Sequence, residues 1–439
     1  MANKIPRPAP VSGDMEWFLN DRFGMFIHWG LYSLPARHEW VQNKEQISNE
    51  DYQKYFDHFN PDLYDPEEWA AMAADAGMKY VVLTTKHHEG FCLWDSKYTD
   101  FKSTKTPYGK DLLHPFVDAF RAEGLRIGFY HSLIDWNHPN FPIDDLHPLR
   151  DHEDREELNK TRDVAKYREY LHNQTRELLT EFGKIDILWY DFSYPSSTDE
   201  KTGKQFVGKG RDDWGSVELL KMVRELQPGI IVNNRLNLPD EEADIHTPEQ
   251  VQPSEWVHVD GKPVNWETCQ TFSGSWGYHR DEASWKSEEQ LVKMLINSVS
   301  CGGNLLMNVG PTSRGIFDER AVKALEAYGE WMYLHSRSIY GCTQSEFEAP
   351  SGCRFTQNGK KLYLHIYDWP YKYLHMKELS GKIEYAQLLN DGSEVFLREA
   401  GKLGGSEHLG GDVDKSLVTL ELPVLKPDVT VPVVELFLK

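Results

Sequence analysis

The sequence predicts an α/β protein in which a (β/α)8-like barrel is followed by a C-terminal antiparallel β-sandwich. Three observations carry this prediction. A chain of 439 residues exceeds one ordinary domain and suits a large domain plus a small one. Up to about residue 340, short apolar runs alternate with amphipathic helical stretches, the pattern of β/α architecture. Beyond that point the long helical patterns stop, so we divide the chain into residues 1–341 and 342–439.

The first part contains a series of apolar runs that predict strands, with amphipathic patterns that predict helices between several of them. Such a series favours parallel strands closed into a barrel-like sheet. A doubly wound open sheet is the alternative, and it is disfavoured because no Gly-x-Gly-x-x-Gly motif follows the first run. The predicted strands are Gly24–Trp29, Tyr80–Thr85, Arg126–His131, Asp186–Tyr190, Ile230–Asn234, Trp266–Phe272 and Asn304–Val309. The predicted helices are Glu67–Ala76, Leu113–Glu123, Val164–Glu181, Val217–Leu226, Ser287–Ser300 and Asp318–His335.

The second part carries turn signals between strand-like runs. Asn358–Gly359 separates Arg354–Thr356 from Lys361–Tyr367, and Asn-Gly is a strong hairpin signal. Asp391–Gly392 predicts a second hairpin. Short strands joined by tight turns indicate a small β-sandwich. The remaining predicted strands are Ile383–Leu389 and Glu394–Leu397, which flank the second turn, and Val418–Leu422 and Val431–Phe437.

Composition limits the partners and the compartment. A net charge of −21 argues against nucleic acid or an anionic membrane, since both require basic surface. The 5 cysteines form no Cys-x-x-Cys pair and are interpreted as buried thiols. No apolar run of about 18 residues is present, and residues 1–13 lack the apolar core of a signal peptide. A cytoplasmic protein is therefore expected unless a signal segment has been removed, and a homo-oligomer is left open.

Chemically capable side chains stand where the predicted strands end. His28 and Trp29 end the first run, His87 and His88 follow the second, and Tyr130 lies near the end of the third. In a parallel barrel these ends converge on one mouth, where active sites are found. Aromatic residues make up 13% of the chain, which suits both a sugar-binding cleft and a large core.

Asp191 is the sharpest candidate for chemistry. It follows a buried-looking apolar run, Ile185–Tyr190, and precedes a loop. A carboxylate held rigidly beside aromatic rings suits a nucleophile that attacks an anomeric carbon, although a loop or helix-capping Asp has the same sequence context. A glycosidase also needs a carboxylic acid to protonate the leaving oxygen, and both Glu249 and Glu267 follow as alternatives.

Two adjacent histidines raise the alternative of a metal site. Imidazoles at a barrel mouth often bind Zn²⁺, but neighbours on a regular strand point to opposite faces. No His-x-His or His-Glu-x-x-His motif accompanies His87 and His88. Neutral His and Tyr side chains that bind sugar hydroxyls fit the sequence better, so no metal or other cofactor is expected.

Taken in order, these segments resemble the α-L-fucosidases of glycoside hydrolase family 29. The resemblance covers most of the chain before about residue 340, and the combination of segments is specific where each alone is weak. The segments are Phe23-Gly24-Met25-Phe26-Ile27-His28-Trp29-Gly30, His38-Glu39-Trp40, Thr84-Thr85-Lys86-His87-His88-Glu89-Gly90-Phe91, Leu188-Trp189-Tyr190-Asp191, Asn234-Arg235, Thr247-Pro248-Glu249, Trp266-Glu267, Ser275-Trp276-Gly277-Tyr278 and Gly302–Pro311.

The resemblance implies a retaining exo-α-L-fucosidase that acts on α-L-fucosylated oligosaccharides or glycoconjugates. It implies Asp191 as the nucleophile and Glu249 as the general acid/base, with Glu267 as a rival for the second role. It further implies a set of substrate-binding residues: His28, Glu39, Trp40, His87, His88, Tyr130, Trp189, Arg235, Glu267 and Trp276.

Two other classes compete with this interpretation. A metal-dependent barrel hydrolase would use the histidines as ligands, and a non-catalytic fucose-binding protein would use the pocket alone. The presence of both Asp191 and Glu249 argues against pure binding, which needs no such pair. The polar segment Ser196–Asp213, directly after the nucleophile run, is expected at the mouth, either shaping the leaving-group site or as a solvated insertion.

Overall fold

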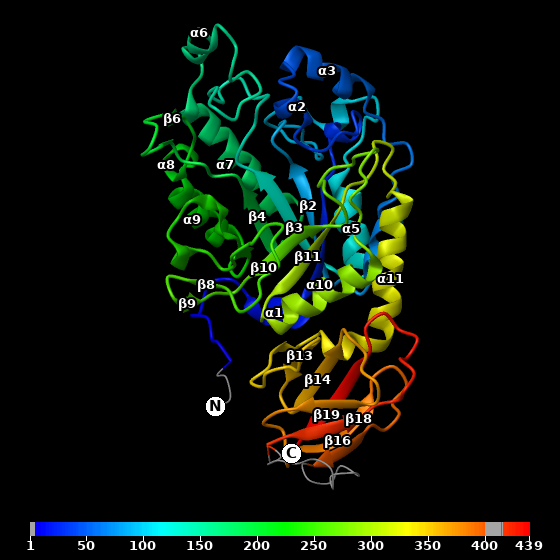
Figure 1. Ribbon diagram of the computed structural model, residues 1–439. Coiled ribbons are helices and arrows are strands. Elements are labelled where there is room, and N and C mark those ends of the chain that lie inside the picture. The colour runs from blue at the N-terminus through cyan, green and yellow to red at the C-terminus, as the bar shows by residue number, and fades with distance from the viewer. Residues whose placement is uncertain (1–4, 400–413, 415) are drawn as a thin grey trace.

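A parallel sheet of 7 strands organises the larger part of the chain (Figure 1). The structure is a computed structural model in which residues 5–399, 414 and 416–439 are described. From edge to edge the strands are β10 (Glu267–Thr271), β11 (Asn304–Val309), β1 (Phe23–Ile27), β2 (Tyr80–Lys86), β3 (Arg126–Ser132), β4 (Ile187–Asp191) and β7 (Ile231–Val232). The strands β1, β2, β3 and β4 lie side by side in their order along the chain, as in a barrel-like α/β domain.

The gap between the edge strands β7 and β10 is spanned by one segment, Ile245–Glu249. Isolated parallel bridges pair Asn233 with Ile245, His246 with Trp266 and Glu249 with Cys269. Backbone bonds from Asp244 N to Val232 O (2.9 Å) and from Cys269 N to Pro248 O (3.1 Å) run on either side. Pro248 has no N–H to donate, which helps keep this segment from forming a regular ladder. The sheet is therefore barrel-like, with an irregular segment between its edges.

Helices surround this sheet, and the main ones begin and end within one residue of the predicted bounds. Asp65 caps α4 by accepting from Glu68 N, and Ser287 and Gln290 form a capping box on α10. The predicted helices are α4 (Pro66–Asp75), α5 (Leu113–Ala122), α7 (Val164–Glu181), α9 (Ser216–Leu226), α10 (Glu288–Ser300) and α11 (Glu319–His335). The α-helices that the sequence did not predict are α1 (Met15–Asp21), α2 (Val41–Lys44), α3 (Asn49–His58), α6 (Arg155–Asn159) and α8 (Arg211–Trp214).

The C-terminal residues form two antiparallel sheets below the barrel-like domain in Figure 1. Both sheets contribute to one apolar core, with Leu364 and Leu436 from the first and Met376 and Leu420 from the second. The first sheet has the order β12 (Thr343–Gln344), β13 (Cys353–Asn358), β14 (Lys361–Ile366), β19 (Val433–Leu438), β16 (Ile383–Leu388). The second has the order β15 (Tyr373–Met376), β18 (Val418–Glu421), β17 (Phe396–Glu399).

Both predicted hairpins formed, the second over a shorter length than predicted. Asn358 pairs with Lys361 across the predicted turn between β13 and β14. Across the turn at Asp391–Gly392, Gln387 bridges to Glu394, Leu388 N donates to Ser393 O at 2.8 Å and Val395 N donates to Ala386 O at 2.9 Å. The chain then crosses to the second sheet, where β17 pairs with β18. The second predicted hairpin is therefore shorter than expected, because Val395 is buried in the core between the sheets and the chain continues from there into the second sheet.

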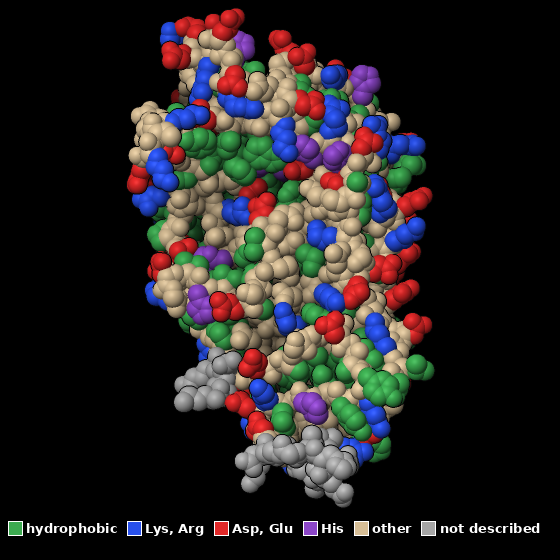
Figure 2. Space-filling view, viewed as in Figure 1, with side chains coloured by type: hydrophobic (Ala, Val, Ile, Leu, Met, Phe, Trp, Pro, Cys, Tyr) green, Lys and Arg blue, Asp and Glu red, His purple; other side chains and the backbone are tan. Residues whose placement is uncertain are grey.

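The surface and the cysteines agree with the composition. Acidic and basic side chains are interspersed over the face seen in Figure 2. All 5 cysteines are free and buried, as predicted. Among the described helices, none has the length and apolar character needed to cross a membrane.

The segment after β4 is fastened to the segment after β3 by a buried ion pair. Lys209 and Tyr194 both bind Asp144 Oδ2, the tyrosine at 2.6 Å, and the Lys209 and Asp144 side chains are 4% and 3% exposed. Between these anchors lies a short hairpin of β5 (Ser197–Thr198) and β6 (Gln205–Phe206), and the β8 (His258–Val259) and β9 (Lys262–Pro263) hairpin lies further along the chain. Val207 N donates to Asp145 Oδ2 at 2.7 Å, so the hairpin is docked rather than free.

We predict that Lys209→Met lowers the free energy of unfolding by about 3–5 kcal/mol, because it leaves the Asp144 carboxylate buried without its cation. Lys209→Met combined with Asp144→Asn should recover most of this loss, since no charge is then stranded. Lys221→Met, at an exposed pair with Glu225, is the control and should change stability by no more than about 0.5 kcal/mol. Urea denaturation measures all three. An equal loss of unfolding free energy in Lys209→Met and in the double variant would contradict the role of Lys209 as the cation that compensates Asp144.

Candidate active site

Asp191 is the last residue of β4, and two donors hold its carboxylate. Tyr130 Oη, from the neighbouring strand β3, donates to Oδ2 at 2.9 Å, and Arg235 Nη1 donates to Oδ1 at 3.2 Å. The following residue, Phe192, has φ of +80°, so the chain turns away directly after the carboxylate. The Asp191 side chain is 13% exposed, which leaves it fixed in position yet reachable from the mouth.

Burial and neighbouring charges act on Asp191 in opposite directions. Burial raises the pKa of the Asp191 carboxyl, the Arg235 cation opposes that rise, and the Glu249 carboxylate adds to it. Burial also raises the pKa of Tyr130, and the nearby Asp191 charge raises it further. Tyr130 therefore remains a hydroxyl donor.

Arg235 joins the two acidic groups that the sequence singled out. Its Nη2 donates to Glu249 Oε2 at 3.0 Å while Nη1 binds Asp191. Nε and Nη2 also bind the Thr247 hydroxyl and carbonyl at 3.0 and 3.1 Å, and the guanidinium lies over the Trp189 ring at 5.0 Å. Burial lowers the pKa of Arg235, but the Asp191 and Glu249 carboxylates outweigh it and raise it overall. The Glu249 side chain is 43% exposed, on the open side of the pair.

Three histidines form one continuous group beside Asp191. The His28 and His87 rings lie 5.6 Å apart, the His87 and His88 rings 4.0 Å, and His88 Nε2 is 3.9 Å from Asp191 Oδ2. Burial lowers the pKa of His28 and of His88, and each is lowered further by His87. Neutral imidazoles follow, which can both accept and donate hydrogen bonds to sugar hydroxyls.

Aromatic rings line the same space. The Trp276 ring lies 5.1 Å from His28, the Trp40 ring lies 4.9 Å from His88, and Trp189 stacks on Tyr130 at 5.9 Å. Glu39 Oε2 accepts a hydrogen bond of 2.9 Å from the backbone N of Gly277, the residue that follows Trp276. The structure thus brings the sequence-predicted residues into one cluster at the carboxyl ends of the strands, with Glu267 as the exception.

Glu267 lies inside the barrel, below this cluster, and its position argues against both roles suggested for it. It is the first residue of β10 and is fully buried. Its carboxyl group accepts from Tyr80 Oη at 2.6 Å and from Trp189 Nε1 at 3.1 Å. The family resemblance had placed Glu267 near the substrate, through the segment Trp266-Glu267 in the predicted strand Trp266–Phe272. That segment lies at the start of a strand, and strand starts lie at the end of the barrel opposite the mouth.

Several residues around the pocket were missed by the sequence interpretation. Asn308, on β11, has Oδ1 at 2.6 Å from His28 Nδ1 and donates from Nδ2 to Trp276 O at 2.7 Å. Ser132 Oγ lies 2.6 Å from His88 Nδ1, and the Phe192 ring packs 5.1 Å from Trp40. Their signal was available, because Asn308 and Ser132 both stand at the carboxyl end of a predicted strand.

No group of three or more His, Cys, Asp or Glu side chains in the described part of the chain is arranged to hold a metal ion.

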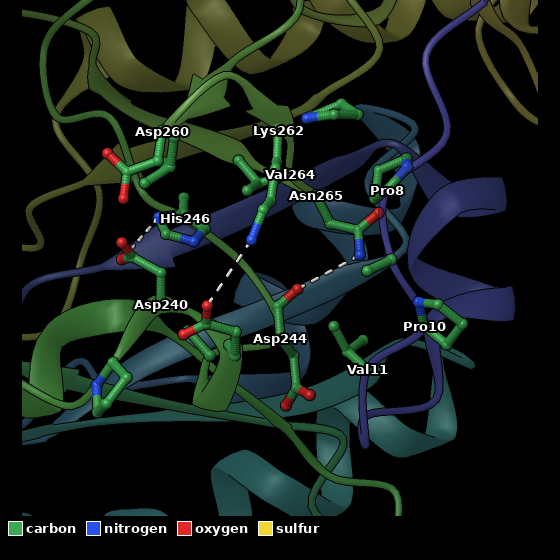
Figure 3. A pocket seen from close by; sticks show the side chains of 16 residues that line it. Pro8, Pro10, Val11, Asp240, Asp244, His246, Asp260, Lys262, Val264 and Asn265 are labelled. Atoms are coloured by element: carbon green, nitrogen blue, oxygen red, sulfur yellow. Dashed lines mark hydrogen bonds and ion pairs between the residues drawn. The ribbon is translucent and has the colours of Figure 1, made fainter.

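A separate cavity of about 490 Å³ lies between the N-terminal segment and the β8–β9 hairpin (Figure 3). Pro8, Pro10 and Val264 line it, with His246 directed toward Asp240 at 4.0 Å. Its described lining contains none of the predicted site residues.

The chemistry of this cluster is that of a glycoside hydrolase. Such an enzyme needs two carboxyl groups that can reach one glycosidic bond, together with neutral donors and acceptors for the sugar hydroxyls. Asp191 and Glu249 share one guanidinium, and the imidazoles and rings surround Asp191.

Comparison with known proteins identifies the family. A sequence model described as Alpha-L-fucosidase matches residues 11–337, and the chain belongs to this family. The chain is 28% identical to the alpha-L-fucosidase of Dictyostelium discoideum over 76% of its own length and 72% of the relative. It is 28% identical to the human tissue alpha-L-fucosidase, covering 83% of this chain and 77% of that one.

Solved structures are similar over nearly the whole chain. Alpha-L-fucosidase isoenzyme 1 from Paenibacillus thiaminolyticus has a TM-score of 0.88 at 43% identity, covering 97% of this chain and 98% of that one. A fucosidase of glycoside hydrolase family 29 from Bacteroides thetaiotaomicron has a TM-score of 0.81 at 26% identity, covering 100% and 99%. That structure holds a trapped covalent intermediate formed with 2-fluoro-fucosyl fluoride.

We predict that Glu267 makes the stability of the protein fall as the pH rises. Burial raises its pKa from 4.5 to about 7, so between these values the folded state binds more protons than the unfolded state. Relative to Glu267→Gln, the wild type should therefore lose about 3 kcal/mol of unfolding free energy between pH 4.5 and 7. Denaturant titrations across this pH range measure the difference.

Glu282→Gln provides the opposite control. Hydrogen bonds from Ser284 lower the pKa of Glu282 to about 2, so this carboxylate stabilises the folded state above its unfolded pKa. The wild type should then gain stability over Glu282→Gln as the pH rises from about 2 to 4.5. A pH-independent difference between wild type and Glu267→Gln would contradict the buried-carboxyl assignment.

Proposed function

We propose that this protein is a retaining exo-α-L-fucosidase that releases terminal α-L-fucosyl groups from oligosaccharides or glycoconjugates. Asp191 is the nucleophile and Glu249 the general acid/base. The observation that carries the proposal is the shared guanidinium of Arg235, which binds Asp191 at 3.2 Å and Glu249 at 3.0 Å. One guanidinium can bind both carboxylates only if they are close neighbours, as the retaining mechanism requires.

The first step forms a covalent fucosyl-enzyme. Asp191 Oδ attacks C1 of the sugar while protonated Glu249 donates its proton to the leaving oxygen, which departs as an alcohol. Tyr130 and Arg235 hold the Asp191 carboxylate so that one oxygen is directed at the anomeric carbon. The covalent intermediate trapped in the Bacteroides thetaiotaomicron relative supports this step.

The second step releases L-fucose. Glu249, which gave up its proton in the first step, takes a proton from the attacking water. The water oxygen bonds to C1 as the ester bond to Asp191 breaks, which restores the Asp191 carboxylate. Two inversions at C1 give net retention, and the steps use only the chain's own carboxyl groups, without a cofactor.

The remaining predicted residues would hold the sugar. His28, His87 and His88 supply hydrogen bonds to its hydroxyls, and Trp40, Trp189 and Trp276 supply apolar walls. Glu39 binds the backbone N–H of Gly277, which follows Trp276, and its carboxylate can accept a hydrogen bond from a sugar hydroxyl. A pocket enclosed by rings on several sides suits a terminal sugar.

The catalytic unit proposed here is residues 1–341, built as a (β/α)8 barrel in which Ile245–Glu249 takes the place of the eighth strand. Residues 342–439 would form the C-terminal β-sandwich domain. The family match, which ends at residue 337, and the bridges on both sides of Ile245–Glu249 support this division.

We predict that Asp191→Gly lowers kcat on an aryl α-L-fucoside by at least about 10³-fold, because the covalent step is lost. Azide should restore turnover and yield the β-fucosyl azide by direct attack. Glu249→Gly with azide should instead yield the α-fucosyl azide, since the nucleophile is intact. Product configuration by NMR measures both. Azide rescue of Glu267→Gly with retained configuration would transfer the acid/base role and overturn the assignment of Glu249.

We predict that Arg235→Lys lowers kcat/KM by about 10²-fold, since a single ammonium cannot bind two carboxylates in the fork geometry of a guanidinium. The matched control is Arg224→Lys, whose guanidinium binds Asp244 at 2.6 Å away from the active-site cluster. It should lower the melting temperature and leave kcat/KM near the wild-type value. Equal kinetic losses in both variants would contradict the bridging role of Arg235.

A further inference from the structure

Glu89 is a buried carboxyl group with no role in the mechanism above. Its side chain is 2% exposed, and neither oxygen has a hydrogen-bond partner among the described residues. His87 Nδ1 lies 3.5 Å from Oε2, and this nitrogen has no hydrogen-bond partner in the described part of the chain. Leaving a buried carboxyl so poorly paired costs stability, so its presence needs an explanation.

The fold keeps space for this carboxyl group. A Cβ atom on Gly30 would lie 2.8 Å from Glu89 Oε1 and 2.9 Å from the Tyr32 ring. The φ of Gly30 is 172°, an extended conformation open to any residue, so the glycine is required by space rather than by its backbone. Two separate segments of the chain thus meet around the Glu89 carboxyl, directly behind His87.

The other two histidines of the pocket have partners at the same ring nitrogen, and these partners fix their tautomers. Asn308 donates from Nδ2 to the Trp276 carbonyl, so its Oδ1 faces His28 and must accept from Nδ1–H. His28 therefore presents an unprotonated Nε2. This nitrogen can accept a hydrogen bond from a sugar hydroxyl.

His88 carries its ring proton on the other nitrogen, Nε2. Ser132 Oγ accepts from Ile134 N at 3.0 Å and can donate its hydroxyl proton to His88 Nδ1 at 2.6 Å. The Asp191 carboxylate, with Oδ2 at 3.9 Å from His88 Nε2, favours the His88 proton on Nε2. The Nε2 atom of His28 can accept a hydrogen bond, and the Nε2 atom of His88 can donate one. Whether Nε2 of the third histidine, His87, accepts or donates depends on the group that faces its Nδ1.

We propose that Glu89 is a positioning residue that holds His87 as the Nδ1–H tautomer, so that Nε2 presents a lone pair to one hydroxyl of the sugar. Glu89 acts through His87 and does not touch the sugar. The inference rests on the proposed function for the identity of the ligand, but the tautomer itself is a property of the free protein. A carboxylate behind a functional imidazole fixes both its proton and its ring orientation.

Glu89→Met tests this role, because methionine is similar in size and removes the acceptor. The proposal expects kcat/KM on an aryl α-L-fucoside to fall about 10- to 100-fold, the usual effect of losing a charged hydrogen bond. The melting temperature should stay the same or rise, since a poorly paired buried carboxyl is removed. Glu89→Gln keeps an oxygen that can accept from Nδ1–H and should restore part of the activity.

A structural carboxylate gives the matched control. Glu177 is also buried, but it accepts from Trp94 Nε1, Ser96 Oγ and Lys97 N, away from the active-site cluster. Glu177→Met should lower the melting temperature and leave kcat/KM near the wild-type value. If Glu89→Met behaves like Glu177→Met, Glu89 is structural and the proposal is wrong.

The direct test is the tautomer of His87 in the free protein, by NMR of ¹⁵N-histidine-labelled wild type with His87→Gln used for assignment. The proposal expects the Nδ1–H form in wild type and its loss in Glu89→Met. An Nε2–H form in wild type, or an unchanged tautomer in Glu89→Met, would overturn it. Because this readout needs no activity, it remains decisive even if the wild type fails to hydrolyse any fucoside and the proposed function falls.

A kinetic cycle tests whether Glu89 acts through His87. In a His87→Gln background, Glu89→Met should add little further loss in kcat/KM, whereas independent roles would give multiplied losses. With a series of monodeoxy aryl fucosides, the effect of Glu89→Met should disappear for the one sugar that lacks the hydroxyl bound by His87. A penalty that is equal for every deoxy sugar would contradict the assignment of Glu89 to a single hydroxyl.

Discussion

The negative charge of Asp191 at the end of β4 is the constraint around which the site is arranged. A carboxylate in a largely desolvated position is costly, and the surrounding residues are those that make it tolerable. Arg235 supplies a cation at 3.2 Å, and Tyr130 supplies a hydroxyl at 2.9 Å. The Arg235 guanidinium also binds Glu249, so the same cation that stabilises the first carboxylate fixes the distance to the second. The pairing of acidic groups that the chemistry requires is thus a consequence of how one buried charge is compensated.

Behind this first layer, the interior of the barrel sets the orientation of the side chains that reach the mouth. Glu267 accepts from Trp189 Nε1, and Trp189 carries Arg235 on its ring face at 5.0 Å. Asn308 holds His28 and the carbonyl of Trp276 at once. Glu267, inside the barrel, thus helps to orient the Trp189 ring on which the Arg235 guanidinium lies. This arrangement explains why buried polar residues, each costly alone, occur in groups that hydrogen-bond to one another.

The segment that follows Asp191 is also fixed by buried polar contacts. Lys209, Asp144 and Tyr194 form a buried cluster that docks it against the segment after β3. Ser193 Oγ donates to the Arg235 carbonyl at 2.7 Å, which links the same segment to the cation of the site. The sequence analysis expected Ser196–Asp213 at the mouth, either shaping the leaving-group site or as a solvated insertion. In the structure its tip is exposed, while Tyr194 and Lys209, near its two ends, are anchored to Asp144.

The sequence by itself determined the main strands and helices and most residues of the candidate site. Apolar runs of strand length and amphipathic helical stretches depend on local periodicity, so β11 and α7 were predicted to the residue. Asp191, His87 and His88 were found because the carboxyl ends of parallel strands must meet at one mouth. What only the tertiary structure decided are contacts between residues far apart in the chain. Sequence could not show that Glu267 lies away from the cluster that contains Glu249, because its burial at the start of β10 depends on the packing of the barrel interior. It could not show that β17 would leave β16 for β18, since a turn signal specifies a reversal and not a partner strand. Nor could it reveal that Gly30 makes room for Glu89, because that packing depends on two strands lying side by side.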